Sequence, residues 1–219
     1  MAIKWAAIVH SETADVAQWQ RDVDRLVDEE RELKAQGVWV RGRDDFFGVL
    51  GIERKEIRHS AMIAWLLDPC APHGLGVRFL AKVMGSAFGD EASSAYLPSA
   101  IARCEAMADL GRVDIVVEGP DLFLVIENKV DSLEGDEQCN SYYRHFRERT
   151  GAQFLFLTPK GVPPTSATQE AAKAFRSMSY RQLRQALAGA LAETVPATPQ
   201  RPGRHIAVDY LHTLTMEFK

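Results

Sequence analysis

The sequence predicts an α/β domain, in which helices cover one sheet, preceded by an N-terminal helical extension. Strand-like runs rich in β-branched and aliphatic residues lie between residues 100 and 130, and another lies at 153–159. Helical apolar spacing dominates the sequence on both sides of these runs. This order of elements is typical of a single α/β domain. The 219 residues, 46% of them hydrophobic, suffice to bury a core without a disulfide or a metal.

Composition and charge narrow the functional classes. No run of about 18 apolar residues is present, so we expect no membrane partner. Three cysteines at unrelated spacings favour free thiols and a cytoplasmic location. The net charge of −4 argues against a nucleic-acid partner, but residues 137–219 hold 11 Lys and Arg against 6 Asp and Glu. A basic half can hold a polyanion, although two ordinary solvated surfaces explain the same numbers.

Residues 13–36 predict a helix that ends before Gly37. Its apolar side chains recur at spacings of three and four, with a glutamate at one of the expected apolar positions. They are Val16, Trp19, Val23, Leu26 and Leu33. This stripe packs either on the body of the domain or against a second subunit. Fewer than four heptads is weak evidence for a coiled coil, which favours intramolecular packing.

The other helices are predicted from apolar spacing and from prolines. A helical stretch begins near Asp45 and stops at Pro69, and a short helix comes after the loop CAPHGLG. Further helices are predicted at 134–149, 181–193 and 205–218, and a surface connection at 90–99. We expect residues 1–44 to form the helical extension and residues 45–219 the α/β domain.

The two strand-like runs at 111–119 and 121–130 predict a hairpin with a turn at residues 118–121. Side chains alternate between the faces of a strand, so Glu127 and Lys129 share one face while Asn128 points to the other. If the two ends of the turn pair with each other, Asp114 is the diagonal neighbour of Glu127 on that face. A turn longer by two residues keeps this parity.

Two interpretations fit these three charged groups. One is an edge hairpin with its charged face in water, where Lys129 bridges Glu127. The other is a hard-cation site, in which Asp114, Glu127 and the backbone carbonyl after Glu127 hold Mg²⁺. Lys129 then contacts a phosphate or the attacking water, which is the arrangement for metal-assisted phosphodiester hydrolysis.

These residues also carry a family resemblance. Val113-Asp114 followed by Glu127-Asn128-Lys129 resembles the motif of the PD-(D/E)XK nuclease superfamily, with Val in place of Pro before the aspartate. The flanking pattern EIRHS…WLLDP…HGLG…ENK…EQ…Y resembles one bacterial branch, from about residue 45 to 215. The resemblance implies a restriction-endonuclease-like core, with a central mixed sheet of four strands, or slightly more, flanked by helices.

The resemblance also implies a set of site residues and a cofactor. Glu56, on the helix before the first strand, joins Asp114 and Glu127 as a metal ligand. The implied cofactor is Mg²⁺, with Mn²⁺ able to substitute. The implied catalytic residues are Asp114, Glu127, Lys129, Glu56 and Gln138, and the implied substrate contacts are His59, Ser60 and Tyr142. His73, in a glycine-rich turn before a helix, is a further candidate phosphate contact from its position.

Each of the assisting residues has a structural alternative. His59 can be a hydrogen-bonded helix histidine, Gln138 a cap and Tyr142 a core aromatic with its hydroxyl paired. The turn at His73 can serve packing alone. A zinc site from His59, Cys70 and His73 lacks the support of a paired CxxC motif.

The leading functional hypothesis is a Mg²⁺-dependent nuclease that acts on DNA, with a role in defence against foreign DNA or in restriction suggested by the bacterial branch. RNA is an alternative substrate, because both polymers are held through the phosphate backbone. The hypothesis from a different class is a catalytically inactive nucleic-acid-binding or assembly module of the same fold. A homodimer and a partner protein that supplies specificity remain open.

Overall fold

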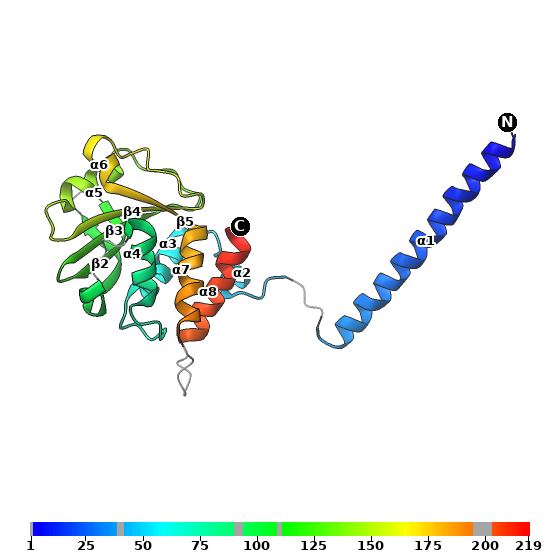
Figure 1. Ribbon diagram of the computed structural model, residues 1–219, viewed down its shortest axis with the longest axis horizontal. Helices are drawn as coiled ribbons and strands as arrows, with labels where there is room; N and C mark the ends of the chain where they lie inside the picture. The colour runs from blue at the N-terminus through cyan, green and yellow to red at the C-terminus, as the bar shows by residue number, and fades with distance from the viewer. Residues whose placement is uncertain (1, 39–41, 90–93, 109–110, 195–202) are drawn as a thin grey trace. The chain divides into compact units, whose positions relative to one another are not determined.

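The computed structural model describes residues 2–38, 42–89, 94–108, 111–194 and 203–219, which form two compact units, Met1–Arg43 and Asp44–Lys219 (Figure 1). No helix in these ranges combines the length and the apolar character that a bilayer crossing needs. The elements are α1 (Ala2–Ala35), α2 (Phe46–Val49), α3 (Glu56–Leu67), α4 (Arg78–Phe88), the 3-10 helix η2 (Ser94–Ser99), β1 (Ile101–Ala108), β2 (Gly111–Gly119), β3 (Leu122–Asn128), α5 (Gln138–Phe146), β4 (Ala152–Thr158), α6 (Gln169–Ala174), β5 (Phe175–Ser179), α7 (Tyr180–Ala192) and α8 (Gly203–Glu217).

The first unit consists of α1 and the turn after it. The helix begins at Ala2, well before the predicted start at residue 13, and ends before Gly37. Four stripe residues, Val16, Trp19, Val23 and Leu26, are between 42% and 75% exposed. The described residues do not decide between the two arrangements expected for this stripe, packing on the body of the domain or against a second subunit.

The second unit is built on a mixed five-stranded sheet in the order β1-β2-β3-β4-β5, which confirms the predicted α/β class. β1, β2 and β3 are antiparallel, and β3, β4 and β5 are parallel. The fifth strand, β5, has the short polar sequence FRSMS and runs directly into α7, so its apolar pattern is too weak to predict a strand. Its last residue, Ser179, caps α7 through a capping box.

Two hydrophobic clusters cover the two faces of the sheet. One face packs against α3, α4, α7 and α8 through alternating residues such as Ile115, Leu124 and Ile126. The other face packs against α5 and α6 through residues such as Val125 and Phe154. All seven residues of β3 are buried because the strand has neighbours on both sides and helices on both faces. A charged side chain on this strand is therefore inside the protein.

The register of the hairpin differs from the predicted one by two residues. Gly119 pairs with Leu122, so the turn residues are Pro120 and Asp121. Proline has a φ angle suited to the second position of a turn and is disfavoured at the third, where the predicted register would place it. Continued beyond the paired residues, this register sets Asp114 directly opposite Glu127. The parity is the predicted one, so both carboxylates share a face.

Gly151, at the start of β4, tests how closely this turn packs. Its φ is +68°, and a Cβ there would lie 2.2 Å from the carbonyl oxygen of Asp121. We expect Gly151→Ala to lower the free energy of unfolding by roughly 3 kcal/mol or more. The backbone has to move to make room for the Cβ, and alanine at this positive φ is also strained. Gly51 is the matched control: its φ is +64° with no atom within 4 Å of such a Cβ. Gly51→Ala should cost only about 1 kcal/mol. Urea unfolding of both variants measures this, and equal costs would contradict the close approach.

Candidate active site

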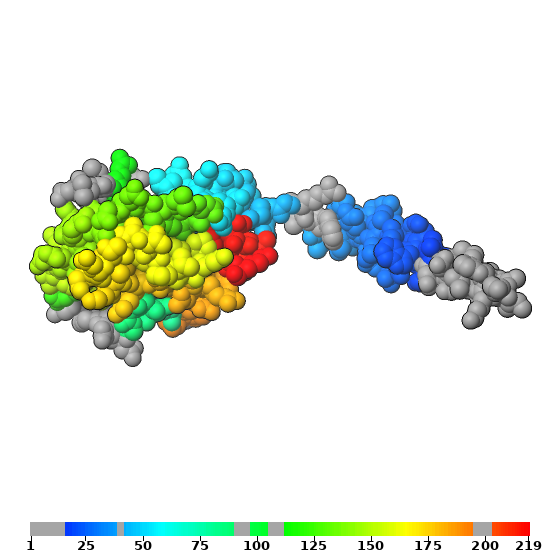
Figure 2. All heavy atoms as spheres, turned by 90° about the horizontal axis from the view of Figure 1, so that it is seen from above, coloured from blue at the N-terminus to red at the C-terminus, as the bar shows by residue number. Residues whose placement is uncertain are grey.

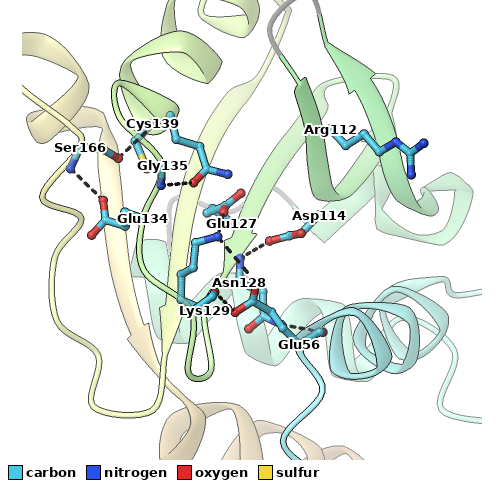
Figure 3. Close-up of polar contacts among 12 residues, drawn as sticks. Glu56, Arg112, Asp114, Glu127, Asn128, Lys129, Glu134, Gly135, Cys139 and Ser166 are labelled. Carbon is cyan, nitrogen blue, oxygen red and sulfur yellow. Dashed lines mark hydrogen bonds and ion pairs between the residues drawn. The ribbon is translucent and has the colours of Figure 1, made fainter. Parts of the chain in front are cut away.

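Two carboxylates from adjacent strands meet on the sheet face that α5 and α6 cover (Figure 3). Asp114, on β2, accepts a hydrogen bond at Oδ2 from the backbone N–H of Asn128, at 2.8 Å. Glu127, on β3, is fully buried, and its Oε1 lies 2.6 Å from Nζ of Lys129. Its other oxygen, Oε2, has no hydrogen-bond partner among the described residues. The site therefore holds a buried carboxylate with an oxygen left over for a ligand.

Lys129 places one ammonium group between two carboxylates. Its Nζ lies 2.6 Å from Glu127 Oε1 and 3.7 Å from Glu56 Oε1, and its side chain is 13% exposed. Burial disfavours the charged form, but the attraction of Glu127, and then of Glu56 and Asp114, outweighs it and raises the pKa of Lys129. The lysine stays charged and supplies the positive charge beside this acidic pair.

Glu56, the first residue of α3, holds the loop after β3. Its Oε2 accepts hydrogen bonds from the Val130 N–H at 2.8 Å and from Ser132 Oγ at 2.5 Å. Its Oε1 faces Lys129. One oxygen of Glu56 is thus occupied by the protein itself, and the other helps to position the ammonium group.

The pKa values of the two opposed carboxyls are both raised. Burial raises the pKa of Glu127 to about 8, the charge of Asp114 adds to this, and Lys129 opposes it. Burial also raises the pKa of Asp114, against the opposing effect of its hydrogen bond from the Asn128 N–H. In both carboxyls the loss of water around the charged form is the main cause of the raised pKa, and it outweighs the attraction of Lys129.

The acidic pair fits a hard divalent cation in its chemistry. Mg²⁺ prefers oxygen ligands. Asp114 and Glu127 provide carboxylate oxygens on one face, and Glu127 Oε2 has no partner among the described residues. The described residues contain no ready-made group of three or more His, Cys, Asp or Glu side chains around a common point. Glu56, which the resemblance implies as a third metal ligand, is instead engaged with the loop through one oxygen and with the Lys129 ammonium through the other.

A hollow of about 600 Å³ opens beside Lys129, between β2 and the start of α5. Gln138 and Tyr142, both predicted site residues, line it but use their polar atoms within the protein. Gln138 Nε2 donates to the Tyr142 hydroxyl at 3.0 Å, and this hydroxyl donates to the Arg112 carbonyl oxygen at 2.7 Å. Gln138 Oε1 accepts from the Gly135 N–H. These two residues shape the wall of the hollow.

Arg112 is a lining residue that sequence reasoning missed. Its side chain is exposed, and it lies two residues before Asp114 on β2, on the same face of the strand. That parity is the signal which could have identified it. The hollow thus has two cationic lining residues, Arg112 and Lys129, and two acidic ones, Asp136 and Glu137.

The structure does not bring His59 and Ser60 to this hollow, which corrects the substrate contacts expected for them. His59 is fully buried, with Nδ1 2.8 Å from the Tyr210 hydroxyl and Nε2 2.8 Å from the Glu53 carbonyl oxygen. Burial lowers its pKa, so it is neutral. Ser60 Oγ accepts from Asn128 Nδ2 at 3.0 Å. These two residues lie one turn after Glu56 on α3, and their side chains are buried among the helices instead of lining the hollow.

His73 is likewise structural. It is fully buried, Nδ1 accepts from the Leu75 N–H at 3.0 Å, and Nε2 therefore carries the proton and donates to the Asp68 carbonyl oxygen at 2.8 Å. Both nitrogens fix the turn before α4, so neither can contact a phosphate. Because both ring nitrogens of His73 and of His59 are hydrogen-bonded within the protein, neither histidine can bind zinc together with Cys70.

The raised pKa of Glu127 predicts a pH-dependent stability in metal-free protein. Between about pH 4.5 and 8 the unfolded chain releases this proton while the folded chain retains it, so stability falls as pH rises. Glu127→Gln cannot ionise, and its melting temperature should exceed that of wild type by an amount that grows by about 4 °C or more from pH 5 to pH 8. Melting curves in EDTA measure this. Glu148→Gln, which changes an exposed carboxylate, should show the same dependence of melting temperature on pH as wild type. A difference between Glu127→Gln and wild type that stays constant with pH would contradict the raised pKa of Glu127.

The family assignment comes from comparison of the whole chain with known proteins. The PD-(D/E)XK nuclease superfamily matches residues 44–210, well over half of the sequence. None of the curated proteins and none of the solved structures in the comparison matches significantly. The match spans the second unit, including the opposed carboxylates, the lysine and the mixed sheet that carries them. The chain belongs to the PD-(D/E)XK nuclease superfamily.

Proposed function

We propose that this protein is a metal-dependent nuclease that hydrolyses phosphodiester bonds in DNA. The observation that carries the proposal is the juxtaposition of Asp114, Glu127 and Lys129 on one buried sheet face, at the edge of a hollow. A merely structural hairpin would place these charges in water, where ion pairs cost little and contribute little. Burying an acidic pair with one cation is unfavourable for stability and is typical of a functional site.

Each group has a distinct task in this proposal. Asp114 and Glu127 hold Mg²⁺, or Mn²⁺ in its place, which supplies a water of lowered pKa and screens charge on the phosphate. Lys129 orients the attacking water. Glu56 positions Lys129 and the loop after β3, and Gln138 shapes the hollow together with Tyr142. Arg112, at the rim, binds a phosphate of the substrate.

The substrate class and the biological setting are proposed from the charge distribution and from the resemblance. The excess of basic residues in the C-terminal part favours a polyanionic substrate. A role in defence or restriction rests on the resemblance to one bacterial branch. We assign hydrolysis to residues 45–219 and a separate role to the extension at 1–44. Free thiols in Cys70, Cys104 and Cys139 favour the cytoplasm. A partner protein would supply any strong sequence specificity.

The decisive test is a cleavage assay, with the same substitution at another aspartate as a matched control. Plasmid, linear duplex, single-stranded DNA and RNA are incubated with the protein in Mg²⁺, Mn²⁺ or EDTA. We expect metal-dependent cleavage of DNA, and a loss of at least about 100-fold in rate for Asp114→Asn, since a metal ligand is removed. Asp121→Asn, in the exposed hairpin turn, should cut as wild type does.

Two results would contradict the proposal. One is cleavage by Asp114→Asn at the wild-type rate with the same metal. The other is binding of DNA with no cleavage in any metal by a folded wild-type protein, which would establish the inactive binding module. Cleavage of RNA alone would keep the chemistry and change the substrate.

Lys129→Arg separates a catalytic lysine from a general positive charge. A planar guanidinium cannot replace a compact ammonium group between Glu127 and Glu56 without displacing one of them. We therefore expect Lys129→Arg to lose nearly as much cleavage as Lys129→Ala, while both still bind DNA in Ca²⁺. Rates at saturating Mg²⁺ and binding curves measure the two effects. Near-normal cleavage by the arginine variant would remove the proposed role in orienting the water.

A further inference from the structure

The apolar stripe of α1 lies on a helix whose polar face is already paired within itself. Among the described side chains, Arg25 lies within ion-pair distance of Asp22 and Glu29, and Arg31 pairs with Asp28. These contacts at spacings of three and four stabilise the helix along its solvent face. Among the residues of this unit whose side chains are described, the stripe has no such partner: Trp19 is 75% exposed and Val16 68%. A single helix of this kind is marginal in water, because most helical stability comes from packing an apolar face.

The spacing of the stripe is that of a coiled-coil seam. Val16, Trp19, Val23 and Leu26 are separated by three, four and three residues, which corresponds to the a and d positions of a heptad repeat. Val27, at the e position after Leu26 and 46% exposed, flanks this seam. Leu33 continues the register after Glu30, which occupies an a position and pairs with Lys34.

The helix is also longer than its most regular apolar segment. It runs from Ala2 to Ala35, about 51 Å at 1.5 Å per residue. In the sequence the same register continues towards the N-terminus at Val9 and Trp5, interrupted by Glu12. The helical backbone thus carries nearly five heptads, which meets the length that a coiled coil needs and that the shorter predicted helix lacked.

The surface of α1 has the shape that a coiled-coil partner requires. A hollow of about 450 Å³ is lined by Val16, Trp19, Gln20 and Val23. These positions are i, i+3, i+4 and i+7, the four that surround the hole into which a side chain of a facing helix inserts. Figure 2 shows the side chains of residues 16–38 of this unit as blue spheres.

We propose that α1 is a dimerisation helix, which pairs along this seam with α1 of a second copy of the chain. The same helix supplies both the knobs, at a and d, and the hole that receives them, so the surface is self-complementary. The dimer places Val16, Trp19, Val23 and Leu26 in a common core. It is independent of the nuclease chemistry, which resides in the second unit.

The oligomeric state of the full-length protein tests this proposal. Sedimentation equilibrium at micromolar concentrations should give twice the chain mass of 24.4 kDa. Val23→Glu adds a charge to the seam and should raise the dissociation constant of the dimer at least 10-fold. Ala17→Glu adds the same charge at an exposed position outside the seam, and should leave the dimer unchanged. Val23→Leu should also remain dimeric, which shows that the site tolerates another apolar side chain.

Folding of the second unit is monitored in parallel by its thermal melting, which none of these variants should change. Loss of helical circular dichroism in Val23→Glu alone is the expected consequence of separating the helices. A monomeric wild-type protein would overturn the proposal, as would a dimer that Val23→Glu does not weaken. Equal weakening by Ala17→Glu would also overturn it, since the seam would then have no special role.

Discussion

The buried carboxylate of Glu127 is the constraint around which this structure is arranged. It lies on a strand whose seven residues are all buried, and it faces a second carboxylate across the hairpin. Moving a charge of this kind out of water costs several kcal/mol unless it is paired or hydrogen-bonded. Lys129 compensates part of the charge and the Asn128 N–H stabilises Asp114, yet the pKa of Glu127 still rises to about 8. Burial and the facing charge of Asp114 thus outweigh the attraction of Lys129, and a divalent cation would stabilise the ionised form of this pair.

The alternation of β3 gives the neighbouring residue a different role. Asn128 points to the opposite face, where its Oδ1 accepts from the Tyr180 hydroxyl and its Nδ2 donates to Ser60 Oγ. Tyr180 stacks on Phe218, and His59 packs against both rings. This network joins the end of β3 to α3, α7 and the C-terminal segment. One strand therefore presents reactive groups to one face and anchors itself through the other, which fixes the positions of Glu127 and Lys129.

Periodicity in the sequence predicts the arrangement of the hairpin, whereas contacts set by tertiary packing could not be predicted. Alternation along the hairpin predicts that Asp114, Glu127 and Lys129 share a face, and parity survives the error of two residues in the register. Structural roles for His59 and His73 were among the alternatives from the sequence, and the sequence did not decide between them and substrate contacts. For His73 the partners are local, at Asp68 and Leu75, whereas the burial of His59 depends on a distant helix. Tyr210, which contacts His59, lies 151 residues away. Arg112 was missed although its position two residues before Asp114 on β2 predicts that the two share a face.

The loop after β3 shows how the fold keeps Lys129 in place while leaving its side chain partly exposed. Arg54 forms a bidentate ion pair with Asp131, and Glu56 binds the loop on either side of that residue. Further along, Glu134 accepts from the backbone N–H groups of Thr165 and Ser166. Anchored at these points, the loop has little freedom to carry Lys129 away from the acidic pair. The lysine is therefore positioned before any substrate binds, and little of the binding energy of a substrate has to be used to order it.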